Sequence, residues 1–222
     1  MTISTAVVVP HPPLLLRELG GIADPVADLR AACSAALSAA LATAPDGVVV
    51  VGPAEPGFDE GAPVDVRRFG TTSARTGPGL PQALGVGRRL LDEAGWTGPA
   101  ALRALPPDAA DADLAGLADE LAARPGREVL LLMAEGSARR LDKGPGMLDE
   151  RAFGFDDAVL RALREGDATA LTALDVDLAR ELMVEGRGSF RLLARLGHPA
   201  RTEVSHADDP YGVLYAVATW TY

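Results

Sequence analysis

The chain is nearly or wholly without several residue types, and each shortage excludes a class of protein. A single cysteine, Cys33, excludes an intramolecular disulfide and a zinc–thiolate cluster. Cys33 falls on the apolar face of a predicted helix, so we expect a packed core thiol. The longest apolar run, Val129 to Ala134, is far shorter than the roughly 20 residues that cross a bilayer. The sequence therefore predicts no membrane span.

Acidic residues outnumber basic ones, 31 to 21. The net charge is −10, and Lys143 is the one lysine of the chain. A protein this acidic repels phosphate, so we expect no general affinity for nucleic acid. The segment Met1 to Val9 has no basic region followed by a signal-like core and leads directly into a predicted strand. We therefore expect a cytoplasmic protein.

The first third of the chain has the pattern of a strand–helix–strand unit. Ile3 to Val9 and Val48 to Val51 are short, β-branched runs, as buried strands are. Between them, Asp24 followed by Pro25 predicts a helix start, with Asp24 as the N-cap, and apolar residues recur at helical spacing to about Thr43. A crossover of this length implies that the two strands are parallel.

The rest of the chain alternates between helical patterns and apolar runs. We expect strands at Glu128–Ala134, Arg201–His206 and Gly212–Trp220, and helices at 81–94, 111–123, 153–164, 168–174, 176–183 and 190–196, with Asp167, Asp175 and Ser189 as N-caps. The long segment from Ala54 to Pro81, with an edge strand at Val64–Phe69, is expected to be a functional loop or flap. The prediction is one α/β domain over residues 1–222, with a mostly parallel central sheet flanked by helices.

Candidate site residues follow three of the predicted strands. His11 and Pro12 follow the first, Glu55 the second, and Glu135 and Ser137 the Glu128 strand. Ligands bind beyond the carboxyl ends of parallel strands, so these five residues are expected to line one pocket. His11 is either a metal ligand or proton carrier, or a hydrogen-bonded loop histidine. The two glutamates are either metal ligands or bases, or helix caps and arginine partners.

Several segments of the sequence resemble segments of a known family. The segment Val7–Leu15 (VVVPHPPLL) resembles the opening of the class III extradiol ring-cleaving dioxygenases, in particular the catalytic B subunit of the protocatechuate 4,5-dioxygenase type, in a superfamily with the Memo-like proteins. Val48–Pro53 is similar to that family's second strand and Ser-Pro-His turn. Val129–Ala138 is similar to the strand that leads into its Gly-Asp-Leu-Ser-His segment. Phe153–Leu174 and Pro210–Gly212 are similar to its following helices and C-terminal end.

The resemblance implies the subunit-B fold and a non-haem iron(II) site built from two histidines and a carboxylate, with a further histidine as acid and base. His11 matches the first histidine ligand. The second ligand falls on Ala54 and the acid–base histidine on Ala138, and neither alanine can replace a histidine. Glu203 is the nearest candidate, by position, for the carboxylate ligand.

Two functions of different classes remain open. The first is a divergent dioxygenase-like protein that has no ring-cleaving activity or catalytic residues and keeps a pocket for a small molecule or a partner protein. The alternative is an active metal-dependent dioxygenase with a rebuilt ligand set of His11, Glu55 and Glu203. A hydrolytic use of the pocket is a third, weaker reading. The sequence leaves open whether the chain forms a homo-oligomer.

Overall fold

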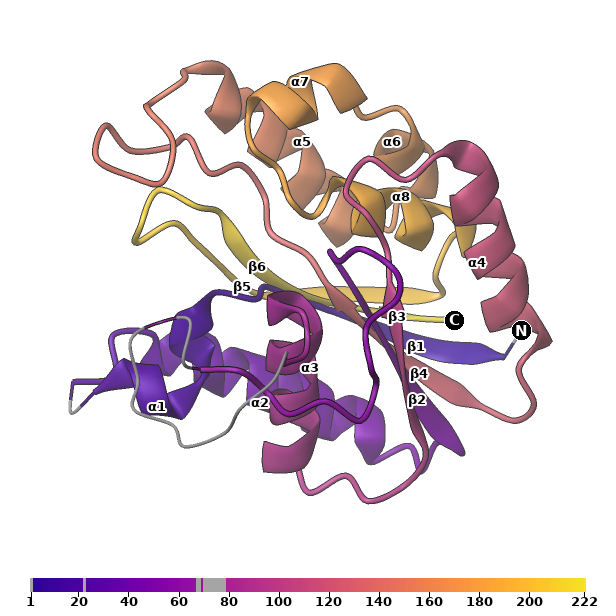
Figure 1. Cartoon of the computed structure of the whole chain (residues 1–222). Helices are drawn as coiled ribbons and strands as arrows, with labels where there is room; N and C mark the ends of the chain where they lie inside the picture. Colours follow the sequence, from indigo (N-terminus) through magenta and orange to yellow (C-terminus); the bar gives the residue numbers. More distant parts are fainter. Residues whose placement is uncertain (1, 22, 67–68, 70–78) are drawn as a thin grey trace.

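The computed structural model describes residues 2–21, 23–66, 69 and 79–222. A six-stranded sheet of order β3-β2-β4-β1-β6-β5 lies between two layers of helices (Figure 1). The strands are β1 (Ile3–Val9), β2 (Gly47–Gly52), β3 (Ala100–Ala104), β4 (Glu128–Met133), β5 (Arg201–Asp208) and β6 (Tyr215–Thr221). The helices are the short 3-10 helix η1 (Pro13–Leu15), α1 (Arg17–Gly20), α2 (Ala27–Leu41), α3 (Gln82–Glu93), α4 (Asp111–Ala123), α5 (Arg151–Glu165), α6 (Ala168–Thr172), α7 (Val176–Glu181) and α8 (Arg187–Arg195).

The sheet is mixed. β3, β2, β4 and β1 run parallel, while β6 is antiparallel to both β1 and β5. The predicted parallel relation of β1 and β2 is confirmed, since both pair in parallel with β4. The α/β class and the flanking helices are also confirmed, but an antiparallel hairpin closes one side of the sheet.

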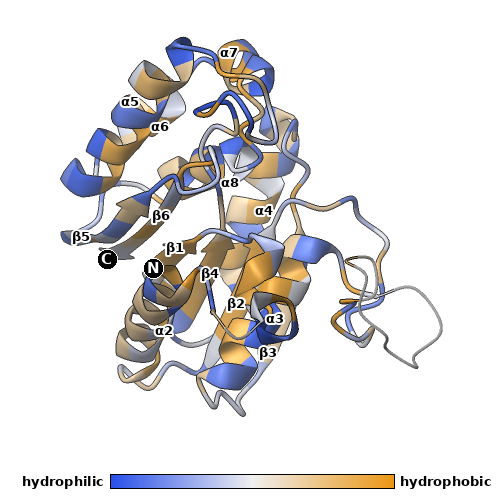
Figure 2. Cartoon of the chain, turned by 90° about the vertical axis from the view of Figure 1, so that its left-hand side faces the viewer, coloured by the Kyte–Doolittle hydropathy of each residue, from blue (hydrophilic) through white to orange (hydrophobic). Residues whose placement is uncertain are grey.

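The central strands β1, β2 and β4 are buried on both faces, which explains why they are mostly apolar. On one face Val7 and Val9 pack with α2 and α3, and on the other Ala6 and Val8 pack with the layer formed by α4 to α8. Figure 2 shows the apolar strands in the middle of the molecule. Side chains of successive strand residues point to opposite faces, so a strand between two helical layers needs apolar residues at every position.

Several boundaries differ from the sequence prediction. β3 was not predicted, and Val64 to Val66 lie outside the strands, while residues 67–68 of that expected strand and residues 70–78 of the expected flap are outside the described residues. Asp24 is not the N-cap of α2, because that helix begins after Val26. Ser189 lies inside α8 and donates its hydroxyl to the carbonyl oxygen of Met133.

Other local predictions are confirmed. The side chains of Asp167 and Asp175 accept hydrogen bonds from the first turns of α6 and α7. Cys33 is fully buried in the core on the α2 side, and burial raises the pKa of its thiol to about 12. Within the described residues, no helix has the length and apolar character that a membrane span requires.

Candidate functional site

The loop that carries His11 is held in place from several directions. His11 stands between Pro10 and Pro12, directly after β1, and η1 follows. Arg30 on α2 is buried and donates to the carbonyl oxygens of Leu14 and Leu15, while Asp24 accepts two further hydrogen bonds from its guanidinium. A planar guanidinium with several fixed donors fastens η1 to α2, and so it fixes the chain just beyond His11.

His11 lies beside Glu135 because the register of β1 and β4 aligns them. Val9, the last residue of β1, is opposite Met133, the last residue of β4. His11 and Glu135 each lie two positions further along the chain. The backbone N–H of His11 donates to Oε1 of Glu135 at 3.0 Å, and Nδ1 of the imidazole lies 3.5 Å from the same oxygen. The Nε2 and Nδ1 atoms are both buried, and neither has a hydrogen-bond partner among the described residues. Such atoms are uncommon in folded proteins and point to a missing partner.

A cavity of about 520 Å³ opens in front of this pair. His11, Pro12 and Glu135 line it from the carboxyl ends of β1 and β4, and Tyr215 lines it from the start of the antiparallel strand β6. Five prolines, with Ala83, Ala138, Val213 and Met183, supply its apolar wall. Gln82 and Glu185 add polar groups from the two helical layers. A concave space that combines apolar walls with a few convergent polar groups is typical of a small-molecule site.

The polar groups of the cavity interact electrostatically. Burial raises the pKa of Glu135, His11 lowers it in part, and the nearby negative charge of Glu185 raises it further. Burial, together with the Glu135 carboxylate, also raises the pKa of Tyr215. Glutamate and tyrosine are both harder to ionise when buried beside another negative charge. None of the described residues that line the cavity is a lysine or an arginine.

Ser137 and Glu55 do not join His11 in this cavity. Ser137 is fully buried, where its backbone N–H and its hydroxyl both donate to Asp156, at 2.9 Å and 2.5 Å. Arg140 donates to the same carboxylate, so Ser137 belongs to a closed hydrogen-bond network. Glu55 is exposed and is not part of the cavity wall, to which β2 contributes Pro53 instead.

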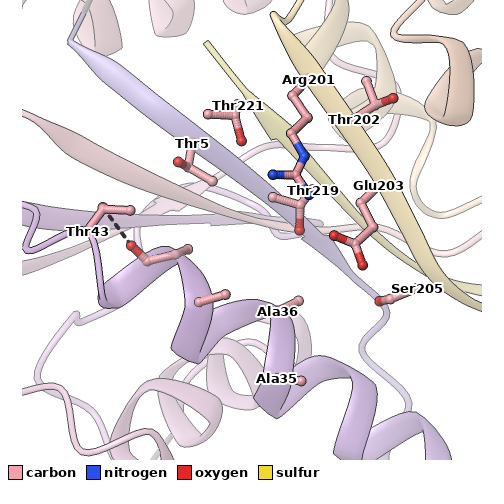
Figure 3. Close-up of a pocket in the computed structure, with 12 residues that line it drawn as sticks. Thr5, Ala35, Ala36, Thr43, Arg201, Thr202, Glu203, Ser205, Thr219 and Thr221 are labelled. Carbon is pink, nitrogen blue, oxygen red and sulfur yellow. Dashed lines mark hydrogen bonds between the residues drawn. The ribbon is translucent and has the colours of Figure 1, made fainter.

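Glu203 lies in a different hollow. This space of about 440 Å³ separates α2 from the β5–β6 hairpin and is lined by Glu203, Arg201, several threonines and the small residues of α2 (Figure 3). Glu203 pairs with Thr219, and Thr219 pairs with Val7, four residues before His11 and two strands from Glu203. At about 3.3 Å per residue and about 4.8 Å per strand, the backbones at positions 11 and 203 are roughly 16 Å apart.

The residues present do not fit the iron site that the family resemblance implies. A facial triad needs three donors on one ion. Among the described residues, no group of three His, Cys, Asp or Glu side chains could hold a metal ion together. His11 and Glu135 are two donors, and Ala138 contributes only a methyl group to the wall.

Sequence reasoning missed Tyr215, Glu185 and Gln82. Tyr215 was expected inside a strand, with nothing in its surroundings to mark it as a site residue, and Glu185 lies in the turn between α7 and α8. None of the three directly follows a parallel strand, and the sequence prediction drew its site residues from positions that do.

Comparison with known proteins finds no family model that matches the chain, and no curated protein that matches it. The α/β sheet and the cavity therefore define the class of protein on their own: an α/β domain with a candidate small-molecule site at the carboxyl edge of its parallel strands.

Proposed function

We propose that this chain is a divergent relative of the class III extradiol dioxygenases that binds a small organic molecule beside His11 and Glu135 and does not cleave aromatic rings. The resemblance of the VVVPHPPLL segment is the basis for the family. The α/β sheet, with His11 directly after β1, is consistent with it.

One observation carries the binding proposal. The His11 side chain is 4% exposed and lines the cavity, and its ring nitrogens have no hydrogen-bond partner among the described residues. A buried polar atom left without a hydrogen bond costs about 1–3 kcal/mol. A ligand that bonds to the imidazole recovers this cost, so the cavity is built to favour an occupant with a polar group and an apolar body.

The loss of ring cleavage follows from the ligand positions. Iron(II) with two protein donors is held weakly, because each ligand also orders the others. Ala138 stands where the resemblance expects an acid–base histidine, and losing such a group lowers a rate typically by about 10²–10⁴. His11 and Glu135 then act as hydrogen-bonding groups for the bound molecule.

The test measures binding and ring cleavage separately. Calorimetry with a set of neutral phenols, catechol among them, should show binding to the native protein that is lost in His11→Ala. It should persist in the control His198→Ala, since His198 bonds to Gly166 away from the cavity. Oxygen uptake with catechol after anaerobic iron loading should be absent, and iron affinity should rise in Ala54→His. Near-equimolar iron with rapid oxygen uptake would overturn the proposal, as would a failure of every phenol to bind.

A further inference from the structure

The cavity beside His11 has many hydrogen-bond acceptors and few donors. Glu135 and Glu185 are carboxylates, which accept hydrogen bonds when ionised. The side-chain amide nitrogen of Gln82 donates to the backbone oxygen of His11 at 3.2 Å, so one of its two N–H groups is already engaged. The Tyr215 hydroxyl and the second N–H of Gln82 are donors in the same lining, but the carboxylate oxygens outnumber them, so a ligand that donates hydrogen bonds suits the cavity.

The imidazole of His11 adds an independent observation. The His11 side chain is 4% exposed, and its two ring nitrogens have no hydrogen-bond partner among the described residues. Nδ1 is the nitrogen nearer to Glu135. A carboxylate beside Nδ1 favours the tautomer with its proton there, which leaves Nε2 as an acceptor. The buried Nε2 atom of His11 is therefore an acceptor without a hydrogen bond, which a ligand with a donor can satisfy.

Charge points in the same direction. Glu185 lies close enough to Glu135 to raise its pKa, and no lysine or arginine is among the described residues that line the cavity. An anionic ligand would meet two carboxylates with no lysine or arginine in the described lining to offset them, and the repulsion would be stronger at Glu135, which is 14% exposed, than at the exposed Glu185. A cationic ligand would offset them.

From this lining we infer that the site selects small organic cations: amines with an apolar, ring-sized body that packs against the proline-rich wall and an ammonium group that donates to Glu135, Glu185 and His11. This inference rests on the proposed function, because it names the class of molecule that the same cavity binds. A site of this kind would bind aromatic carboxylates weakly.

Three probes of one shape test the selection by charge. Tyramine is cationic, para-ethylphenol neutral and para-hydroxyphenylacetate anionic, and all three carry the same phenol ring. Calorimetry at low ionic strength should rank their affinities in that order, with tyramine at least about tenfold tighter than the anion, a difference of about 1.4 kcal/mol. Added salt should weaken tyramine binding more than para-ethylphenol binding, because screening acts on charge.

The decisive variant is Glu185→Gln. Glu185 is exposed at the cavity rim, so its replacement leaves the core intact. We expect tyramine affinity to fall by about threefold to tenfold and para-ethylphenol affinity to stay the same. The control is Glu181→Gln, since Glu181 is exposed on α7, pairs with Arg151 and does not line the cavity.

The outcomes separate the inference from the proposed function. Binding of para-ethylphenol with no preference for tyramine, or a preference that survives Glu185→Gln, overturns the cation inference and leaves the small-molecule proposal standing. Failure of all three probes to bind, together with the neutral phenols above, overturns both. Tight binding of the anion would contradict the assigned charge of the cavity directly.

Discussion

Oε1 of Glu135 accepts a hydrogen bond from the backbone N–H of His11 and also lies 3.5 Å from Nδ1 of the His11 ring. One carboxylate oxygen thus accepts a hydrogen bond from the main chain of the histidine and lies beside its ring. The Glu135 side chain is 14% exposed, and a largely desolvated charge with incomplete partners is costly to the folded state.

The first prediction concerns the effect of Glu135 on stability against pH. Burial raises the pKa of Glu135 above its ordinary 4.5, so the folded protein binds this proton more tightly than the unfolded chain. The carboxyl therefore favours folding at low pH, and this contribution is lost as pH rises through the folded pKa. Glu135→Gln removes the titration. The variant should match the native protein at about pH 4.5 and exceed its free energy of unfolding towards neutral pH.

Urea unfolding across that pH range measures the difference. Glu185→Gln is the matched control, since Glu185 is exposed and its loss should change stability by less than about 0.5 kcal/mol. A Glu135→Gln variant that is uniformly less stable than the native protein would show that the His11 contact outweighs the cost of burial.

A second prediction concerns Gly186, whose backbone bonds to Glu135. A Cβ atom at position 186 would lie 2.5 Å from the carbonyl oxygen of Glu135 and 2.8 Å from its nitrogen. The φ of Gly186 is −74°, so the constraint is space and not conformation. Gly186→Ala should cost about 1–3 kcal/mol, since backbone must move, and should weaken binding at the cavity.

Gly154 on α5 is the control for that substitution, because a Cβ atom there meets nothing within 4 Å. Gly154→Ala should stabilise the protein by about 0.5–1 kcal/mol, since alanine loses less backbone entropy in a helix. Thermal unfolding of the two variants provides the comparison. Equal stability of both would mean that the approach of Gly186 to Glu135 is not tight.

A third prediction concerns the reactivity of Cys33. This thiol is fully buried, and burial raises its pKa to about 12. The thiolate is the reactive form, so the folded protein should resist a thiol-reactive dye at mildly alkaline pH. Labelling should follow the urea unfolding curve and reach one thiol per chain in the unfolded state. Rapid labelling of the folded protein would mean that α2 opens locally.

The sequence was informative where burial alone decides structure. β1, β2 and β4 are central strands covered on both faces, so each is a continuous apolar run. β3 is an edge strand with only Leu102 buried, and its residues Ala-Ala-Leu-Arg-Ala have little strand preference. Leu102 is held by pairing with β2 and by a hydrogen bond from its N–H to Glu60, 42 residues earlier. Contacts this distant leave no local pattern.

The same distinction applies to caps and to the site. The Asp24–Pro25 pair has the local pattern of a helix start, but Asp24 pairs with Arg30 instead. His11 and Glu135 follow adjacent parallel strands, so their approach could be expected from the fold class. Glu185 reaches the cavity only because of how α7 and α8 pack, and Tyr215 only because β6 runs antiparallel to β1. Tertiary packing decides both, and one sequence alone does not encode it visibly.

The last prediction concerns Asp156, the centre of the buried network behind the site. Its carboxylate is fully buried and accepts hydrogen bonds from the N–H and hydroxyl of Ser137 and from Arg140, whose guanidinium also bonds to Asp209. Asp156→Ala would leave these donors unsatisfied and Arg140 short of one of its partners. Removing one member of a buried charge pair costs about 3–5 kcal/mol.

We therefore expect Asp156→Ala to lower the free energy of unfolding by about 3 kcal/mol, at the lower end because Arg140 is partly exposed and keeps Asp209. Asp156→Asn should lose less, since its amide oxygen can still accept the N–H of Ser137 while its NH₂ group faces donors. The control is Asp157→Ala, one residue along α5 but exposed, which should change stability by less than about 0.5 kcal/mol. Urea unfolding of the three variants at neutral pH gives the ranking. An Asp156→Ala variant as stable as Asp157→Ala would mean that the network adds no net stability, and that Ser137 and Arg140 find other partners when the carboxylate is gone.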